Sequence, residues 1–371
     1  MTPVKVPFFD PSPMHAPLRE AILADVAATL DAGDFVNGAA VGEFEQAFAE
    51  FVGRDHCVGT SSGLDALRLG LLAAGIEPGD EVLVPANTFA ATFEAVTQAG
   101  GRPVPVDVSE RDLNLDPDAA EAAVGPRTRF VLPVHLYGQL ADMRRILDLA
   151  ERRDLHVVED ACQAHGAERD GLRAGACSLV SGFSFYPTKN LGAIGDAGAL
   201  VTDDAAVASR TRALREHGQT AKYEHTFEGY TARLDTIQAF ALLRKLQHLH
   251  EWTAQRREAA RRYSEVLTGI GDLELLPVPA GSDPVWHVYL VRTANPERLA
   301  TFLRERGIVT GRHYPTPPHL SEAYAWLGKG EGDFPVTENL ARRGLSLPIF
   351  PGITGEQIAY VGEQIGAFFD G

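Results

Sequence analysis

Short apolar runs alternate with amphipathic stretches from about residue 55 to about residue 205, and this alternation is the strongest constraint on the fold. The apolar runs have the length of strands, and the stretches between them carry apolar residues at helical spacing. Such a chain is predicted to form an α/β fold, in which helices cover both faces of a mostly parallel central sheet. The predicted strands are His56–Thr60, Glu81–Pro85, Pro103–Val108, Phe130–His135, His156–Glu159, Leu179–Phe185 and Gly198–Thr202, and the predicted helices are Ser62–Ala74, Ala90–Ala99, Pro117–Val124 and Asp142–Arg152.

The chain departs from that alternation at its last two predicted strands, because a glycine-containing loop and no helix separates them. We expect these two strands to be joined in an antiparallel or irregular way. One long helix is then predicted from Asp235 to about Leu267, and a shorter α+β series follows it. That series comprises strands Trp286–Arg292 and Ile308–Tyr314 and helices Pro296–Arg306 and Thr354–Phe368. We therefore expect a large domain at residues 1–250 and a smaller C-terminal α+β domain at residues 251–371.

Composition and charge narrow the class of protein. Of the 371 residues, 45% are hydrophobic and 23% are charged, which is typical of a globular protein. The formal net charge of −16 disfavours nucleic acid as the main partner, although a few cationic side chains can still bind a small anion. No apolar run reaches the roughly 18 residues of a membrane span, and no secretion signal is visible, so we expect a cytoplasmic protein. The spacing of Cys57, Cys162 and Cys177 matches no zinc site, so no metal is expected.

Lys189 is the first candidate catalytic residue. It follows an apolar predicted strand and lies between Pro187 and Gly192, which hold it close to the edge of the sheet. Partial removal from water would lower the pKa of its amine and make the amine nucleophilic towards a carbonyl carbon. Since a loop lysine is commonly an ordinary surface residue, its neighbours decide its role.

Asp160 is the second candidate, because it ends a run that is apolar enough to be a central strand. A carboxylate at such a place is costly unless it meets a cation. A protonated pyridine nitrogen would be a suitable cation, since a carboxylate there keeps the ring able to withdraw electrons. The alternative is that Asp160 caps a helix or pairs with an arginine.

Two further features lie at predicted strand ends, where open α/β sheets bind their ligands. The turn Ser61-Ser62-Gly63 leads into a helix, so its backbone N–H groups can bind a phosphate, with Ser184 as a further donor. A plain helix cap is the alternative for this turn. Phe89 can stack on a flat ring, or it can be a core residue.

With these residues in place, the chain resembles the DegT/DnrJ/EryC1/StrS aminotransferases, the sugar aminotransferase family within the fold-type-I enzymes that use pyridoxal phosphate (PLP). The resemblance runs over nearly the whole chain, and its motifs are specific in combination. They are GTSSGLDAL (59–67), GDEVLVPANTFAAT (79–92), VPVHLYGQ (132–139), VVEDACQAHGA (157–167), GFSFYPTKNLGAIGDAGAL (182–200), GYTARLDTIQA (229–239) and LSLPIFPGIT (345–354).

The resemblance implies a role for each matching position. Lys189 would form the Schiff base with PLP, and Asp160 would meet the pyridine nitrogen. The other implied cofactor residues are Gln163 near the ring hydroxyl, Phe89 stacked on the ring, and Ser62, Gly63 and Ser184 at the phosphate. The resemblance also implies a homodimer, with the active site at the subunit interface and a GYN-x-R-like loop that reaches in from the partner subunit.

That loop departs from the family pattern, because Thr231 of GYTAR stands where the family usually has asparagine. Threonine can still donate a hydrogen bond to a phosphate, but its reach is shorter. Candidate contacts to the sugar nucleotide come from the cationic and polar residues of two loop regions and are Arg233, His313, Tyr314 and Lys222.

The implied reaction transfers an amino group from an amino acid, expected to be glutamate, to a keto sugar. The motifs are most similar to those of members that act at C3 of dTDP-linked deoxy sugars. Amination at C4, amination of a keto-inositol (a cyclitol), and a PLP-binding regulatory role without turnover remain as alternatives. A nucleotide-dependent dehydrogenase is disfavoured, since no G-x-G-x-x-G follows the first strand.

Overall fold

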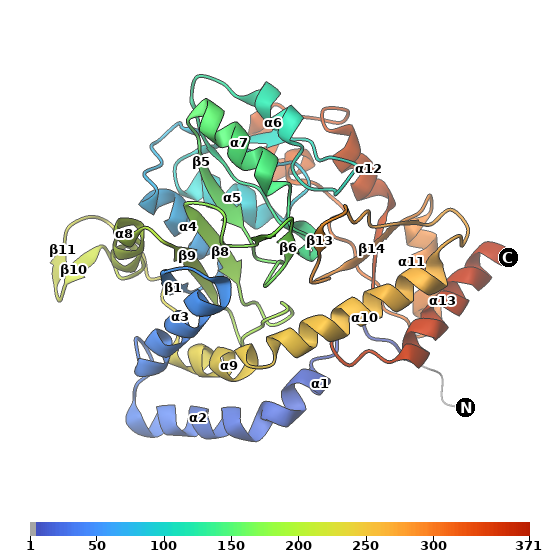
Figure 1. Ribbon diagram of the computed structural model, residues 1–371, viewed down its shortest axis with the longest axis horizontal. Coiled ribbons are helices and arrows are strands. Elements are labelled where there is room, and N and C mark those ends of the chain that lie inside the picture. The colour runs from blue at the N-terminus through green and yellow to red at the C-terminus, as the bar shows by residue number, and fades with distance from the viewer. Residues whose placement is uncertain (1–4) are drawn as a thin grey trace.

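A seven-stranded sheet forms the centre of the molecule, which the computed structural model describes over residues 5–371 (Figure 1). The strand order is β1-β9-β8-β5-β4-β2-β3. All neighbouring pairs are parallel except those of β9, which runs antiparallel to both β1 and β8. The strands are β1 (His56–Thr60), β2 (Glu81–Pro85), β3 (Arg102–Val106), β4 (Thr128–Val131), β5 (His156–Asp160), β8 (Val180–Ser184) and β9 (Gly198–Thr202).

Helices cover both faces of this sheet, because alternate strand residues point to opposite faces. In β2, Val82 and Val84 pack into one buried cluster, and Leu83 packs into the other. Each fully buried valine or leucine of this kind contributes about 1.5–3 kcal/mol. One face carries α4 (Gly63–Ala73), α5 (Ala90–Gln98) and α8 (Ala205–Arg215), and the other carries α3 (Ala39–Val52), α6 (Pro117–Ala123) and α7 (Met143–Arg153). The predicted fold class is confirmed, as is the antiparallel pairing of the last two strands, β8 and β9.

The long helix predicted from Asp235 to about Leu267 is wrong as a single element. The chain forms α9 (Thr236–Leu246) and α10 (Leu249–Leu267), with a break at Gln247 and His248. The two helices have different packing partners, which explains the break. α9 packs against α3 and α2 (Arg19–Ala32), whereas α10 packs against α13 (Gly355–Asp370).

The strand predicted at Ile308–Tyr314 is also wrong. This segment forms only isolated bridges, from Ile308 to Val6 and from Gly311 to Ser346, because it passes between two partners and pairs continuously with neither. The strand predicted at Trp286–Arg292 begins only at Tyr289, since Trp286 has a φ of 48° that no regular strand accommodates.

A third buried cluster lies in the C-terminal part of the chain, around α10, α13 and a small three-stranded sheet. The order of that sheet is β12 (Glu274–Leu275), β14 (Tyr289–Arg292) and β15 (Gly344–Leu347). The expected domain boundary after residue 250 falls at the start of α10. The remaining elements are α1 (Ser12–His15), β6 (Glu168–Arg169), β7 (Leu172–Arg173), β10 (Gln219–Ala221), β11 (Glu224–His225), β13 (Ser282–Asp283), α11 (Pro296–Glu305) and α12 (Pro335–Arg343), together with short 3₁₀ turns at Ala16–Leu18, Leu136–Gly138, Pro318–Leu320 and Glu322–Leu327.

Two kinds of feature are absent from residues 5–371. No helix there is long and apolar enough to cross a membrane. No group of three or more His, Cys, Asp or Glu side chains in that range is arranged to hold a metal ion.

Candidate active site

The carboxyl ends of neighbouring strands bring the main candidate residues to one edge of the sheet. Asp160 is the last residue of β5 and Ser184 is the last residue of β8, and these two strands are adjacent. Lys189 follows in the loop after β8, and Phe89 follows β2 at the start of α5. This edge is the place where parallel α/β sheets bind their ligands.

Lys189 lies in a tightly closed loop. Its N–H donates to the carbonyl of Tyr186 at 2.8 Å, and the N–H of Ala193 donates to the carbonyl of Phe185 at 2.8 Å. Burial lowers the pKa of the Lys189 amine, and the nearby Cys162 and Asp160 oppose this shift. A lowered pKa raises the fraction of neutral amine, which is the nucleophilic form.

Asp160 is a buried carboxylate, with only 6% of the residue exposed. Its Oδ2 accepts a hydrogen bond from the Thr92 hydroxyl at 2.8 Å, and its Oδ1 accepts one from the Cys162 N–H at 3.1 Å. Among the ion pairs formed by residues 5–371, none involves this carboxylate. Asp160 therefore neither pairs with an arginine nor caps a helix, and the site fits a ligand that brings its own cation, such as a protonated ring nitrogen.

The N-terminus of α4 lies beside the end of β8. The Ser62 hydroxyl accepts the N–H of Asp65 at 3.1 Å, so Ser62 is the helix cap that the alternative interpretation proposed. Only glycine fits at position 63, since a Cβ atom there would lie 2.6 Å from the Ser184 Cβ and 2.8 Å from the Cys162 Sγ. The helix N-terminus next to Ser184 provides N–H groups of the kind that bind a phosphate.

Phe89 and Gln163 contact the same tyrosine. Phe89 is 54% exposed, so it is not a core residue, and its ring centroid lies 5.3 Å from that of Tyr314. The Gln163 amide donates from Nε2 to the Tyr314 hydroxyl at 3.1 Å, and its Oε1 accepts the N–H of Tyr137 at 2.8 Å. Tyr314, although distant in sequence, therefore belongs to this site.

His313 lies next to this group and is a neutral side chain. Burial and the charge of Lys189 lower the pKa of its imidazole to about 4. Its Nδ1 lies 2.8 Å from the Ser346 hydroxyl, and its backbone carbonyl accepts a hydrogen bond from the Tyr137 hydroxyl at 2.9 Å. His313 can thus offer a polar contact to a substrate, but at neutral pH it does not offer a positive charge.

The side chains of the remaining three candidates contact other residues than the site candidates, although a backbone bridge joins Arg233 to Thr60, next to the Ser61-Ser62-Gly63 turn. Thr231 is exposed, and its hydroxyl lies 3.1 Å from the His217 Nε2. Arg233 donates to the carboxylate of Glu216 at 2.7 Å. Lys222 lies between β10 and β11, in a hairpin that projects from the body of the molecule (Figure 1).

Two residues that support the site were missed in the sequence. Thr92, in the first turn of α5, follows Thr88 by four residues, and their hydroxyls lie 2.8 Å apart, so this spacing was a signal in the sequence. Tyr137 has a φ of 62°, and its hydroxyl also accepts a hydrogen bond from Asn87 at 3.2 Å. No local pattern around Tyr137 indicates these contacts, because its partners are far away in the chain.

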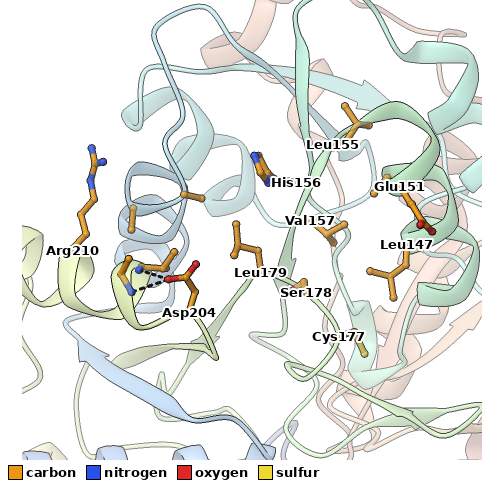
Figure 2. A pocket seen from close by; sticks show the side chains of 15 residues that line it. Leu147, Glu151, Leu155, His156, Val157, Cys177, Ser178, Leu179, Asp204 and Arg210 are labelled. Atoms are coloured by element: carbon orange, nitrogen blue, oxygen red, sulfur yellow. Dashed lines mark hydrogen bonds between the residues drawn. The ribbon is translucent and has the colours of Figure 1, made fainter.

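A hollow lies at the opposite end of β5, the strand that ends in Asp160. Leu155, His156 and Val157, at the amino end of β5, line it together with Arg210 (Figure 2). Asp204, also drawn there, accepts the N–H groups of the first turn of α8 and is thus a helix cap. Asp160 lies at the other end of β5, so this hollow is separate from the candidate active site.

Comparisons with known proteins agree with this geometry. The model of the DegT/DnrJ/EryC1/StrS aminotransferase family matches residues 17–366. The dTDP-3-amino-3,4,6-trideoxy-alpha-D-glucose transaminase of Streptomyces venezuelae is 47% identical over 347 residues, which cover 94% of this chain and 92% of that protein.

Two solved structures share the fold over almost the whole chain. The structure of S. venezuelae DesV in complex with a ketimine intermediate has a TM-score of 0.97 at 45% identity, and covers 100% of both chains. The structure of Bacillus subtilis NtdA with its bound cofactor PMP has a TM-score of 0.91 at 33% identity, and covers 99% of this chain and 86% of that one. The chain therefore belongs to the DegT/DnrJ/EryC1/StrS aminotransferase family.

Proposed function

We propose that this aminotransferase uses PLP to transfer an amino group to the C3 keto group of a nucleotide-linked deoxy sugar. The observation that carries the proposal is the buried Asp160 carboxylate, which forms no ion pair within residues 5–371, at the same sheet edge as a lysine whose amine has a lowered pKa. The likeness to a dTDP-sugar transaminase over 94% of the chain supports the substrate class and the C3 position.

The residues at the sheet edge have side chains of the types that a PLP site needs. Lys189 would bind the cofactor carbonyl, and Asp160 would accept the ring N–H. The other proposed contacts are Gln163 at the ring hydroxyl, Phe89 on the ring face, and Ser62, Gly63 and Ser184 at the phosphate. When bound, PLP supplies an electron sink for the carbon that gains or loses the amino group.

The chain's own residues have two roles in the proposed reaction, proton transfer by Lys189 and the fixing of Asp160. Once the amino donor has replaced it on the cofactor, the Lys189 amine would accept the α-proton of the donor as a general base. It would then return this proton, as a general acid, to the cofactor carbon that it had bound. Asp160 must stay fixed on the ring nitrogen, and the hydrogen bonds from Thr92 and the Cys162 N–H hold both of its oxygens. Tyr314 and His313 lie beside Gln163 and Phe89, and we propose them as contacts to the sugar.

We further propose a homodimer in which Thr231, Arg233 and Lys222 of one subunit serve the active site of the other. Within one subunit, the side chain of Thr231 contacts His217 and that of Arg233 binds Glu216, and neither contacts Lys189 or Asp160, which supports this proposal. The hairpin that carries Lys222 also exposes Tyr223 by 80% and Phe227 by 39%, and α2 exposes Leu30 by 62%. A contiguous patch of such side chains would be typical of an interface with another protein chain.

An absorbance titration tests the central claim. The purified protein with PLP should show the visible band of a lysine-bound cofactor, and glutamate should abolish this band while 2-oxoglutarate is released. Lys189→Ala should form no such band. If the wild type forms none either, the assignment of Lys189 is wrong.

A substrate panel then separates the remaining alternatives. We expect turnover with a dTDP-linked 3-keto-6-deoxy sugar and none with a 4-keto sugar nucleotide or a keto-inositol. A bound cofactor that no keto sugar and no amino acid discharges would instead favour the regulatory role. Glutamate as donor, a cytoplasmic location and a place in antibiotic biosynthesis belong to the same proposal.

A further inference from the structure

Lys245 in α9 is a buried cation without a counterion. The residue is 2% exposed, and within residues 5–371 its ammonium group forms no ion pair with a carboxylate. Burial lowers the pKa of this amine to about 8. An unpaired charge in the interior is costly, so its hydrogen bonds indicate what the residue does there.

The ammonium group of Lys245 has a partner for each of its three protons. It donates to the backbone carbonyl of Gly192 at 2.7 Å and to that of Ala193 at 3.4 Å. The third partner is the His15 Nε2 at 2.8 Å. Burial and the charge of Lys245 lower the pKa of His15, so its ring is neutral and can accept a hydrogen bond.

The two carbonyls belong to the loop that carries Lys189. The backbone of that loop is closely packed at Gly192, since a Cβ atom there would lie 2.4 Å from the carbonyl oxygen of Pro187. α9 also holds Ile194, the residue after Ala193, because the Gln238 side chain accepts the N–H of Ile194 at 2.9 Å. Directly after Lys189, the Asn190 side chain donates to the carbonyl of Val285 at 2.8 Å.

We infer that Lys245 is a positioning residue for Lys189, which fixes the returning leg of the Lys189 loop to α9 through the carbonyls of Gly192 and Ala193. The inference rests on the proposed role of Lys189 as the residue that binds PLP. Without the ammonium group, the two carbonyls lose their donor, and the Lys189 amine is no longer held at one place relative to Asp160. A displacement of a reacting group by about 1 Å can lower the rate by roughly a hundredfold.

The test compares Lys245→Met with Arg244→Met. Methionine keeps the length of the lysine side chain but cannot donate. The control removes a cation from the neighbouring residue, whose guanidinium is 45% exposed and pairs with Asp25 on α2. Both variants are purified as full chains, and far-ultraviolet circular dichroism without cofactor first shows whether each is folded.

Three measurements with PLP then separate positioning from folding. For Lys245→Met we expect a visible circular dichroism band of altered intensity, because the bound ring is held in a new orientation. We also expect a kcat about tenfold or more below wild type, with a KM for the sugar changed by less than about threefold. The PLP dissociation constant should rise, and Arg244→Met should match the wild type in all three.

A folded Lys245→Met that matches Arg244→Met in the circular dichroism band and in kcat would overturn the inference. If Lys245→Met does not fold, Lys245→Gln replaces it, since its amide can still donate to one carbonyl. Failure of both to fold would also count against positioning, because Lys245 would then be needed for folding. The wild-type protein separates this inference from the proposed function, since a wild type without a lysine-bound PLP band contradicts the role of Lys189 itself.

Discussion

At the scale of single residues, the chemistry of the site depends on how its two ionisable groups are held. Lys189 and Asp160 lie at the same sheet edge, but their surroundings disfavour the charge of Lys189 and support that of Asp160. Burial shifts the Lys189 amine towards its neutral form, whereas Asp160 is given donors to both oxygens. An amine with a lowered pKa and a firmly held carboxylate suit a lysine that binds a carbonyl and a carboxylate that accepts a ring N–H.

Thr92→Val tests the support of Asp160. The variant removes the hydroxyl that donates to Asp160 Oδ2 and leaves that buried oxygen without this donor. A hydrogen bond to a charged group is worth about 1.5–3 kcal/mol, so PLP affinity should fall by roughly 10- to 100-fold. Spectral titration with PLP measures this loss.

Thr97→Val on the same helix is the matched control, because the Thr97 hydroxyl donates to the carbonyls of Phe93 and Glu94 within α5 and not to Asp160. Thr92→Ser should keep most of the affinity. Equal PLP affinities for Thr92→Val and Thr97→Val would mean that Thr92 does not support the cofactor site.

At the scale of elements, a buried carboxylate fastens β5 to the segment that leads into β8. Both side-chain oxygens of Glu159 are used, and the side chain is fully buried. Its donors are the His135 ring at 2.8 Å, the N–H groups of Gly175 at 3.0 Å and Cys177 at 3.1 Å, and the hydroxyls of Ser178 at 2.7 Å and Ser181 at 2.9 Å. This brace holds together the two strands whose ends carry Asp160 and Ser184.

Glu159→Gln should therefore destabilise the fold in a pH-dependent way. Burial alone would raise the pKa of Glu159, but hydrogen bonds from His135 and the neighbouring groups outweigh it and lower the pKa to about 2. A carboxyl with a depressed pKa stabilises the fold above its ordinary value of 4.5, and that contribution is lost as the pH falls towards 2. The variant should lose about 1–3 kcal/mol at pH 7.

Denaturant unfolding of the wild type and of Glu159→Gln measures this loss. The difference between their free energies of unfolding should shrink as the pH falls below 4.5. The exposed Glu151→Gln on α7 is the control and should change neither the stability nor its pH dependence. A difference that stays constant down to pH 3 would contradict the assigned role of the ionised carboxylate.

At the scale of the whole molecule, the proposed dimer would complete each active site with residues of both subunits. Lys189 and Asp160 belong to one subunit, and Arg233 is proposed to serve the other. In a twofold dimer, mixing two different damaged subunits creates one site that carries neither lesion. The test is to unfold Lys189→Ala and Arg233→Ala and refold them together. Half of the randomly formed dimers then contain one subunit of each kind and have one intact site of two, so about a quarter of wild-type activity should return.

Lys189→Ala mixed with Asp160→Asn is the matched control. Both lesions lie in the same subunit's site, so every site in the mixed dimer carries one of them and no activity should return. If the Arg233 mixture shows only the average activity of its two parents, the shared site is wrong. Elution of the wild type as a monomer in size-exclusion chromatography would contradict the dimer as well.

The sequence determined what depends on local pattern. Three strands, β1, β2 and β9, begin and end where the apolar runs predicted, because a buried strand needs a continuous apolar run. Lys189 and Asp160 were identifiable for a related reason, since each follows such a run and the carboxyl ends of neighbouring strands meet at one edge.

Tertiary contacts decided the rest. The break between α9 and α10 arises because the two helices pack against different partners, and residues 308–314 form no strand because their bridges go to two separate segments. The donor to Asp160 Oδ2 and the packing of Lys245 against the Lys189 loop come from residues 50 or more positions apart in the chain: Thr92 lies 68 residues from Asp160, and Gly192 lies 53 residues from Lys245. Periodicity reports only which face of an element is buried, whereas these contacts depend on which elements come together.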